Sequence, residues 1–528
     1  MRPRIEDGYD AIVIGSGFGG TLAAHELIRC GHRVALLERG PWVQRGPENW
    51  APDAYGPMTP YYSMEAPYRA LAGGEKDRVG AFHCVGGPSV FYGGASLRFR
   101  AEDFEHDADI VTDSGARWPY RYRDLEEWYA RAERVIGVSG ELGGDPTEPY
   151  HSTPYPQLLG ALAPTSRRIA QAARRLGLHP SRLPLAFNHG RGGGRSPCTA
   201  CPTCDGFACA IGAKNDLATA VLPKLMRQGL ALRPNTVALR LVREGRSVQA
   251  VECVDRNTRQ PVRYQASQFV LAAGALASPH LLLASGLDEL NPAGRFVGRF
   301  LMRHFNAVVM GLFPRRPDER QFHKQIVIHD YYFGHPSVRK PIGKLGGIQQ
   351  LVTPPAELVK QYLAPGIGSL AASGLSHVTG LLVIAEDQPR AENHLAVDPQ
   401  SRDAFGLPEL LITHRYTERD QSAGRVLVQK AKEILHGAGA VATYVQPILS
   451  FSHAVGTVRT GIDPETSPLD AECRFRGVDN LRVVDASFFP TSAGVNPSLT
   501  IAANALRAGA RVAAALGRSN PVAMARGA

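Results

Sequence analysis

A group of residues near the start of the chain has the types and spacing of a nucleotide-binding turn. Gly15, Gly17 and Gly20 form a Gly-x-Gly-x-x-Gly pattern, and Glu38 follows at the distance at which an acidic side chain can bind ribose hydroxyls. The first glycine permits a tight bend, the second lets the backbone approach a pyrophosphate, and the third lets a helix pack closely on a strand. This spacing predicts a dinucleotide site.

A second group with chemical potential is formed by four of the eight cysteines, namely Cys198, Cys201, Cys204 and Cys209. In a reducing compartment, such clustering favours metal or iron–sulfur ligation over disulfides. The first three follow ferredoxin-like spacing, and the fourth thiolate could complete an iron–sulfur cluster. Zinc is an alternative, although structural zinc usually takes two separated pairs of ligands. A loop with free or paired thiols is an equal alternative. The sequence therefore does not assign these cysteines as metal ligands.

The glycine pattern needs a strand, a helix and a second strand to position it. Residues 10–14 form a short apolar run typical of a buried strand, residues 21–29 have helical periodicity, and residues 33–38 form a second apolar strand. The helix would begin directly after the glycines, so its free N–H groups would face a phosphate.

Two later segments complete the same sheet. Residues 268–274 form a strand that ends in small residues, and residues 480–485 form another, followed by a helix over 497–516 with proline in its first turn. A dinucleotide domain built from the start, middle and end of a chain is typical of large flavoproteins. These segments favour FAD over a nicotinamide cofactor.

Composition narrows the class of protein. The chain has 528 residues, a net charge of +10 and 44% hydrophobic residues, which excludes a disordered chain, a coiled coil and a collagen-like repeat. Its basic residues are scattered, so we expect no nucleic-acid partner. No apolar run is long enough to span a membrane, and the charged N-terminus is unlike a secretory leader. The sequence predicts a cytoplasmic protein.

Further motifs follow one another along nearly the whole chain. They are Val85–Gly94, Val297–His304, His453–Thr457, Gly477–Ser487 and Gly494–Ile501. Together with the first glycine turn, they resemble the signature segments of the glucose–methanol–choline (GMC) oxidoreductase family. The His–Asn pair His453 and Asn496 is similar to that of its pyranose-oxidase-like and cholesterol-oxidase-like branches.

The resemblance implies an α/β fold (α+β overall), in which a Rossmann-like FAD-binding domain carries an inserted substrate domain made of an antiparallel sheet and helices. The FAD-binding domain is expected in three parts, and the substrate domain in two. The FAD-binding parts are 1–110, 196–310 with the Cys-rich loop, and 450–528 with the active-site residues. The substrate parts are 111–195 and 311–449.

The resemblance also implies an alcohol oxidation. Hydride leaves a carbinol for flavin N5, while a base removes the hydroxyl proton, and a neutral imidazole suits that role near neutral pH. His453 is the expected base, and Asn496 is expected to hydrogen-bond the substrate hydroxyl. Asn496 could equally cap the following helix, since asparagine is a favoured N-cap. His304 is expected to brace the flavin domain rather than to do chemistry.

Cofactor-binding residues are expected in several of these motifs and in the strands between them. The full set is Gly15, Gly17, Gly20, Glu38, Gly86, Gly87, Ser89, Tyr92, Gly93, Gly94, Val237, Ala273, Gly274, Asp485, Ala486, Asn496 and Pro497. Asp485 is expected to accept a hydrogen bond from the ribityl chain. Some pyranose oxidases attach the flavin to a histidine, but Phe91 stands at the matching position here. We therefore expect FAD to bind non-covalently.

The inserted domain carries no readable specificity code. A sugar, a glycoside, a polyol or a sterol-like alcohol each fits as the substrate, and the electron acceptor is open, with a dehydrogenase slightly favoured over an oxidase. A small subunit or a cytochrome could be the partner, as in multi-subunit relatives. Two other classes compete with this interpretation, a redox-neutral flavoprotein and an electron-transfer subunit without a substrate of its own.

Overall fold

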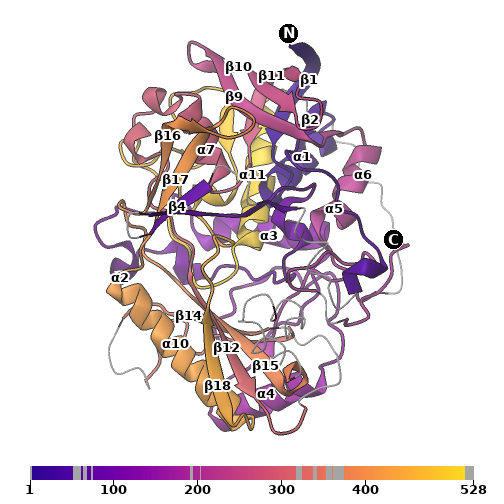
Figure 1. The fold of residues 1–528 in the computed structure, drawn as a ribbon, viewed down its shortest axis with the longest axis vertical. Helices are drawn as coiled ribbons and strands as arrows, with labels where there is room; N and C mark the ends of the chain where they lie inside the picture. The colour runs from indigo at the N-terminus through magenta and orange to yellow at the C-terminus, as the bar shows by residue number, and fades with distance from the viewer. Residues whose placement is uncertain are drawn as a thin grey trace.

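The computed structural model describes residues 3–50, 61–63, 68–72, 75–190, 194–201, 204–316, 324–336, 342–351, 360 and 374–517. The following account concerns these residues. Figure 1 shows an elongated molecule with the first strand and its sheet at one end, and a second sheet with two flanking helices at the other.

The chain begins with the expected strand–helix–strand unit. β1 (Arg4–Ile14) pairs in parallel with β2 (Val34–Leu37), and α1 (Phe18–Arg29) connects them. Only the last four residues of β1 are fully buried, which is why the apolar pattern marks residues 10–14 alone. The exposed first half of the strand is held by backbone pairing with β11 (Pro261–Leu271).

The first sheet is assembled from segments that lie far apart in the sequence. Its order is β8-β2-β1-β11-β10-β9, and β19 pairs with β11 on the other side. The β8, β2, β1, β11 and β19 pairings are parallel, whereas β9, β10 and β11 form an antiparallel meander. The remaining bounds are β8 (Ala231–Arg233), β9 (Thr236–Glu244), β10 (Ser247–Asp255) and β19 (Leu481–Val483).

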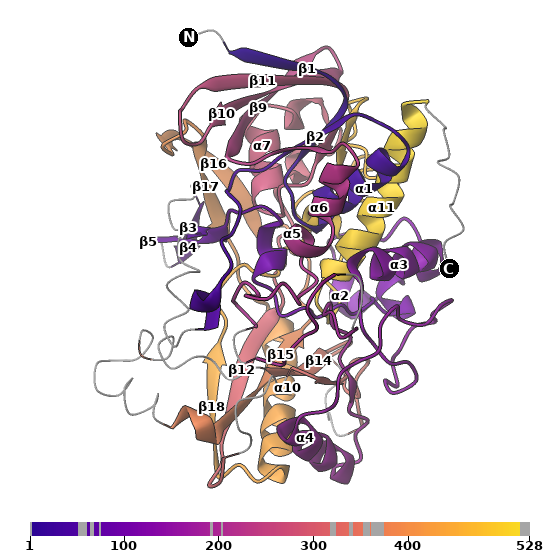
Figure 2. The same ribbon diagram turned by 90° about the vertical axis from the view of Figure 1, so that its right-hand side faces the viewer.

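Helices from both ends of the chain cover this sheet. Figure 2 shows α1 beside α11 (Ser498–Ala515), with α3 (Tyr122–Ile136) next to α11. The approach of α11 to α1 is close, because a Cβ atom at Gly509 would lie only 2.9 Å from the carbonyl oxygen of Ala23. Small residues along α11 therefore set the distance between the two helices.

The second sheet is antiparallel throughout and has the order β18-β12-β15-β14-β13-β7. The helices α4 (Pro164–Arg175) and α10 (Glu418–Gly437) pack on one of its faces with an apolar cluster of their own. The strand bounds are β7 (Ser181–Arg182), β12 (Phe305–Leu312), β13 (Ile326–Ile328), β14 (Gly346–Leu351), β15 (Val378–Ala385) and β18 (Ala442–Pro447).

A four-stranded sheet, β16-β17-β4-β5, and a two-stranded sheet, β3-β6, complete the strands. Their bounds are β3 (Tyr62–Ser63), β4 (Tyr68–Ala72), β5 (Glu75–Arg78), β6 (Ala81–Phe82), β16 (His394–Arg402) and β17 (Pro408–Thr413). The remaining α-helices are α2 (Ala108–Val111), α5 (Leu217–Ala220), α6 (Leu222–Arg227) and α7 (Ala277–Ala284).

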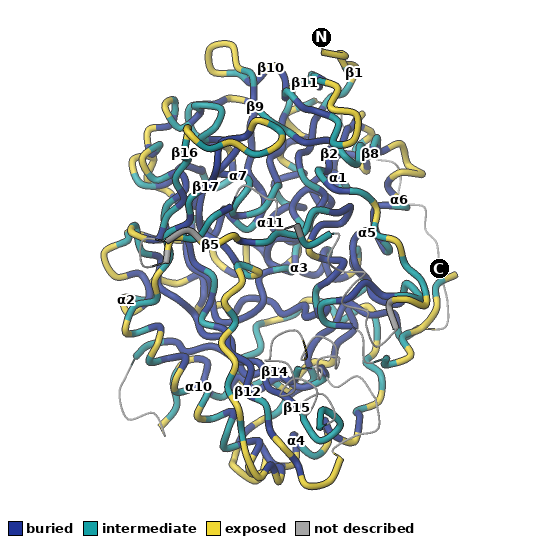
Figure 3. Tube along the Cα trace, viewed as in Figure 1, coloured by how far each residue is buried: buried dark blue, intermediate teal, exposed yellow. Residues whose placement is uncertain are grey.

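Burial follows these layers. Figure 3 shows most of the inner strands of both large sheets and the inner side of α11 buried, while the edge strand β18, the start of β1 and the turn between β9 and β10 are exposed. β12 begins at Phe305, before the residue 310 at which the second part of the FAD-binding domain was expected to end. The predicted domain boundaries stay predictions. Within the described residues, no helix is long and apolar enough to cross a membrane.

Candidate active site

The glycine turn between β1 and α1 has the close contacts that its spacing predicts. A Cβ atom at Gly20 would lie 1.8 Å from the carbonyl oxygen of Gly15, so only glycine lets the helix sit this close to the strand. A Cβ atom at Gly17 would meet nothing within 4 Å. Gly17 therefore borders open space at the N-terminus of α1, which has no side-chain cap. The free N–H groups of α1 fit the phosphates of a dinucleotide.

Ser16 connects Glu38 with the later glycine-rich loop. Its hydroxyl donates to Glu38 Oε2 at 2.5 Å and accepts from the backbone N–H of Gly86 at 2.9 Å. The other oxygen of Glu38 accepts from the N–H of Gly40 at 2.8 Å. Because Glu38 is nearly fully buried, its pKa is raised by burial, and these hydrogen bonds partly oppose the shift. The first glycine turn and the later glycine-rich loop thus form one unit.

Asp485 ties the end of β19 to the turn after β11. One of its carboxylate oxygens accepts from the N–H of Gly274 and from the hydroxyl of Ser278, and the other accepts from the N–H and hydroxyl of Ser487. Asp485 therefore positions the Gly274 turn. Its predicted contact with the ribityl chain would be additional to these four protein hydrogen bonds.

The other predicted cofactor residues lie on the same loops. Ser89 donates to the Gly86 carbonyl oxygen and accepts from the N–H of Leu217, so its hydroxyl holds the glycine-rich loop in place. Val237 lies on β9 in a small apolar cluster. The N–H of Ala273 donates to Ser278, and a Cβ atom at Gly274 would meet nothing within 4 Å. The remaining members lie in short 3-10 helices (Gly87 and Ala486) or in the loops next to them (Tyr92, Gly93, Gly94 and Pro497).

His453 and Asn496 lie side by side, as the resemblance implies. Asn496 Nδ2 is 3.5 Å from His453 Nε2, which is long for a hydrogen bond and leaves both atoms able to contact a third group. The alternative role of Asn496 as a helix cap is wrong. Helix α11 begins at Ser498, and its flanking residue Pro497 provides no side-chain cap. The Asn496 carboxamide is instead turned toward β14.

Two residues that the sequence did not single out complete this cluster. Gln349 on β14 donates from Nε2 to Asn496 Oδ1 at 2.6 Å. The ammonium group of Lys324 lies against Gly93, where an added Cβ atom would be only 2.3 Å from Nζ. Lys324 Nζ also forms an ion pair with Asp205 at 2.7 Å. Neither residue belongs to a recognisable motif, since both come from the inserted segment between residues 311 and 449. A pattern of buried polar residues in apolar strands is the only signal that could have indicated Gln349.

His304 contacts the expected base directly. His304 Nδ1 lies 3.1 Å from His453 Nδ1, and His304 Nε2 lies 3.0 Å from the carbonyl oxygen of Ser492. The His304 backbone is held as well, because its N–H donates to Asp387 Oδ1. His304 therefore also holds the side chain of His453 in place.

Burial keeps both imidazoles neutral. Burial, together with the nearby His304 and Lys324, lowers the pKa of His453 to about 3, and Asp387 opposes this shift. Burial also lowers the pKa of His304. A neutral His453 has one nitrogen with a free lone pair, which is what a base requires.

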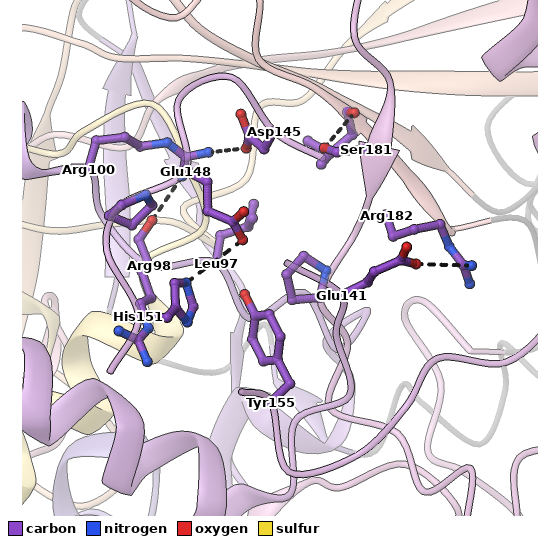
Figure 4. Close-up of a pocket in the computed structure, with 13 residues that line it drawn as sticks. Leu97, Arg98, Arg100, Glu141, Asp145, Glu148, His151, Tyr155, Ser181 and Arg182 are labelled. Carbon is purple, nitrogen blue, oxygen red and sulfur yellow. Dashed lines mark hydrogen bonds and ion pairs between the residues drawn. The ribbon is translucent and has the colours of Figure 1, made fainter. Parts of the chain in front are cut away.

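A polar pocket lies beside the second sheet, as Figure 4 shows. Each of its three arginines is paired with a carboxylate, Arg98 with Glu133 at 2.7 Å, Arg100 with Asp145 at 2.7 Å, and Arg182 with Glu141 at 3.9 Å. In the first two pairs the opposite charges compensate each other in buried surroundings, whereas Glu141 of the third pair is exposed. We assign this pocket a structural role.

The four clustered cysteines line one small cavity together with Phe187, Ile211 and Lys214. Backbone N–H groups of Ala200 and Ala213 donate to Cys198 Sγ and Cys209 Sγ. Even so, no group of three or more Cys, His, Asp or Glu side chains in the described part of the chain is arranged to hold a metal ion. As placed, these four cysteines do not fit an iron–sulfur cluster.

Lys214 fastens this Cys-rich segment to the glycine-rich loop. Its buried ammonium group donates to the carbonyl oxygens of Val90 and Tyr92 in the loop, and to those of Cys204 and Phe207 in the Cys-rich segment. The segment thus has a structural role beside the predicted flavin site.

Two family models, both described as GMC oxidoreductase, match residues 9–306 and 389–505. The 6'''-hydroxyparomomycin C oxidase of Streptomyces lividus is 31% identical, over 96% of this chain and 92% of that protein. The paromamine 6'-oxidase of Streptomyces fradiae is 30% identical, over 96% of this chain and 91% of that protein.

A solved structure shows the same fold. The pyridoxine 4-oxidase from Mesorbium loti has a TM-score of 0.67 at 21% identity, and the match covers 96% of this chain and 99% of that one. Together these matches confirm the predicted α/β fold class and the predicted FAD-dependent oxidoreductase of CH–OH groups. The chain belongs to the GMC oxidoreductase family.

Proposed function

We propose that this chain, with FAD bound, oxidises a carbinol of a sugar-like or polyol substrate to a carbonyl group, with His453 as the base and Asn496 as the partner of the hydroxyl. The observation that carries the proposal is the pairing of His453 Nε2 with Asn496 Nδ2 directly before α11. Bound FAD would supply the hydride acceptor.

A backbone carbonyl oxygen determines which ring nitrogen of His453 carries the proton. The oxygen of Ser492 can only accept, so His304 Nε2 must carry the proton that it receives. In a neutral His304, Nδ1 is then a lone pair, which accepts from His453 Nδ1–H. His453 Nε2 is left as a lone pair facing Asn496. This tautomer can take the proton of a substrate hydroxyl group.

Asn496 supports the same step from the other side. Its Nδ2–H group can donate to the substrate oxygen while that oxygen gives its proton to His453. The donor is aimed where negative charge develops on the oxygen. The N-terminus of α11 also has a partial positive charge, which would stabilise an anionic reduced flavin.

A polar, polyhydroxylated substrate is favoured by the relatives. The two proteins reported above are named as oxidases of paromamine and of 6'''-hydroxyparomomycin C. In this chain, polar side chains such as Gln349 and Lys324 lie next to the His–Asn pair, which suits a hydroxylated ligand better than a sterol.

Three further parts of the proposal concern the surroundings of the reaction. FAD is bound non-covalently, because the position that matches the flavin-attaching histidine of some pyranose oxidases holds Phe91, whose phenyl ring offers no atom for such a bond and stacks on Phe82 with ring centroids 4.6 Å apart. The enzyme acts in the cytoplasm. The electron acceptor is either oxygen or a partner such as a small subunit or a cytochrome, since some relatives are named as oxidases and others as a dehydrogenase flavoprotein or large subunit.

Anaerobic mixing of the FAD-loaded protein with alcohols, polyols and aminosugars tests this function. We expect at least one polyhydroxylated compound to bleach the flavin absorption without oxygen, and oxygen or an artificial dye to restore it. A redox-neutral flavoprotein would keep its oxidised spectrum with every compound. That result would contradict the proposal.

A further inference from the structure

A chain of hydrogen bonds starts at the carbonyl oxygen of Ser492, runs through His304 and His453, and continues past Asn496. Because His453 Nε2 is a lone pair, Asn496 must present Nδ2–H to it. The carboxamide oxygen of Asn496 then faces Gln349, and only Nε2–H of Gln349 can donate to it. The orientation of both amides therefore follows from the carbonyl oxygen of Ser492 together with the neutral form of His304.

This order leaves one atom without a partner. Gln349 is fully buried, and among the residues that the structure describes its Oε1 atom has no hydrogen-bond partner. A buried acceptor without a donor has lost its hydrogen bonds to water, and no protein hydrogen bond offsets this cost in free energy. Such an atom next to a predicted active site indicates a place for a hydrogen-bond donor of the ligand.

The position of Gln349 in the second sheet supports this assignment. Gln349 is paired with Leu382 and Gly347 with Ile384, and residues that pair across antiparallel strands share a face. This face is opposite to the one that packs on α4 and α10, because the neighbouring Gln350 is paired with Leu381 of that cluster. Gln349 thus lies on the side of the sheet that approaches Asn496.

The rest of that face is mainly apolar. Leu382 and Ile384 form a small buried cluster with Val308 on β12. A Cβ atom at Gly347 would lie 3.7 Å from the carbonyl oxygen of Gly494, so the face runs close to the segment that carries Asn496. Gln349 thus lies among mostly apolar side chains, with Asn306 opposite Ile384 and the His329 ring beside Gly347 as further polar groups. A few polar groups in a mainly apolar lining are the usual arrangement of a ligand site.

We propose that Gln349 determines substrate specificity by accepting, through Oε1, a hydrogen bond from a hydroxyl or ammonium group next to the reacting carbinol. The same side chain positions Asn496 through Nε2. The inference rests on the proposed function and deepens it, because it selects vicinal diols and amino alcohols over simple monoalcohols.

Three small probes test this inference with the anaerobic FAD-loaded protein. They are 1-propanol, 1,2-propanediol and 2-amino-1-propanol, which differ only in the group beside the carbinol. Binding is read from the change in the visible spectrum of the oxidised flavin, and reduction from its bleaching. We expect the diol and the amino alcohol to bind about tenfold more tightly than 1-propanol, since one hydrogen bond is at stake. The tighter of the two identifies the donor.

Variants at Gln349 assign the difference to this residue. In Gln349→Met the preference should fall to about one, whereas Gln350→Met, on the opposite face of the same strand, should keep it. Gln349→Glu retains the acceptor and adds a negative charge, so it should favour the amino alcohol over the diol. This second variant tests the inference even where Gln349→Met does not fold.

The two proposals fail in different ways. Equal affinity of the native protein for all three probes, or an unchanged preference in Gln349→Met, would overturn the role of Gln349. If the probes bind with the expected preference but none bleaches the flavin, the role of Gln349 stands and these alcohols are excluded as substrates. Bleaching without preference supports the oxidation and contradicts the inference.

Discussion

The Nδ1 atoms of His304 and His453 lie 3.1 Å apart, although 149 residues separate them in the sequence. His304 directly precedes β12, and His453 lies in a segment between β18 and β19. The contact joins the second sheet to the predicted catalytic pair. It makes the protonation of one imidazole depend on the other.

His304→Phe should slow the anaerobic reduction of the flavin by a substrate about tenfold or more, because His453 Nδ1–H loses its acceptor and the wrong tautomer becomes populated. FAD content should stay as in the native protein. Stopped-flow absorbance measures the rate. His304→Gln offers an oxygen to His453 and should recover most of it. A native rate in His304→Phe would show that the contact has no functional role.

The rate of flavin reduction should be nearly constant between pH 8 and pH 5. The pKa of His453 is lowered to about 3, so its neutral form persists as the pH falls. A histidine with an ordinary pKa of 6.5 would lose about 30-fold in rate at pH 5, because only a small fraction would remain unprotonated. FAD retention and circular dichroism at each pH serve as controls. A loss centred near pH 6.5 would contradict the lowered pKa.

Gly17 and Gly20 should respond differently to alanine. Gly17→Ala adds a Cβ atom to open space at a φ of −69°, so the free energy of unfolding without FAD should change by less than about 0.5 kcal/mol. The same atom would occupy the predicted pyrophosphate site, and FAD should bind at least tenfold more weakly. Titration with FAD and denaturant unfolding measure the two effects.

Gly20→Ala should instead destabilise the fold itself, by about 1–3 kcal/mol or more, since its Cβ atom would overlap the Gly15 carbonyl oxygen. A Gly17→Ala variant that is unstable yet binds FAD normally would reverse the assignment of these two glycines.

The flavin half of the fold could be predicted because its signals are local. The glycine turn and the strand around residues 268–274 carry spacing and apolar patterns that depend on backbone geometry. The unexpected parts lack such signals. The first half of β1 is exposed and held only by pairing with β11, so no apolar pattern marks it.

The candidate site could be predicted only in part. His453 and Asn496 were found through motifs, and the structure places them together. Gln349 lies in an ordinary buried strand, and its contact with Asn496 depends on how the second sheet docks beside α11, which no local pattern encodes. The cap role of Asn496 was wrong because its carboxamide bonds Gln349 rather than the helix.

The most direct test of the account is the anaerobic rate of flavin reduction in His453→Ala, measured by stopped flow at matched FAD content. His179→Ala, which removes a surface imidazole paired with Asp330, is the control and should keep the native rate. We expect His453→Ala to retain FAD and to reduce it about 10²–10⁴-fold more slowly, the usual contribution of a general base. A His453→Ala protein that reduces its flavin as fast as the native protein would contradict the account.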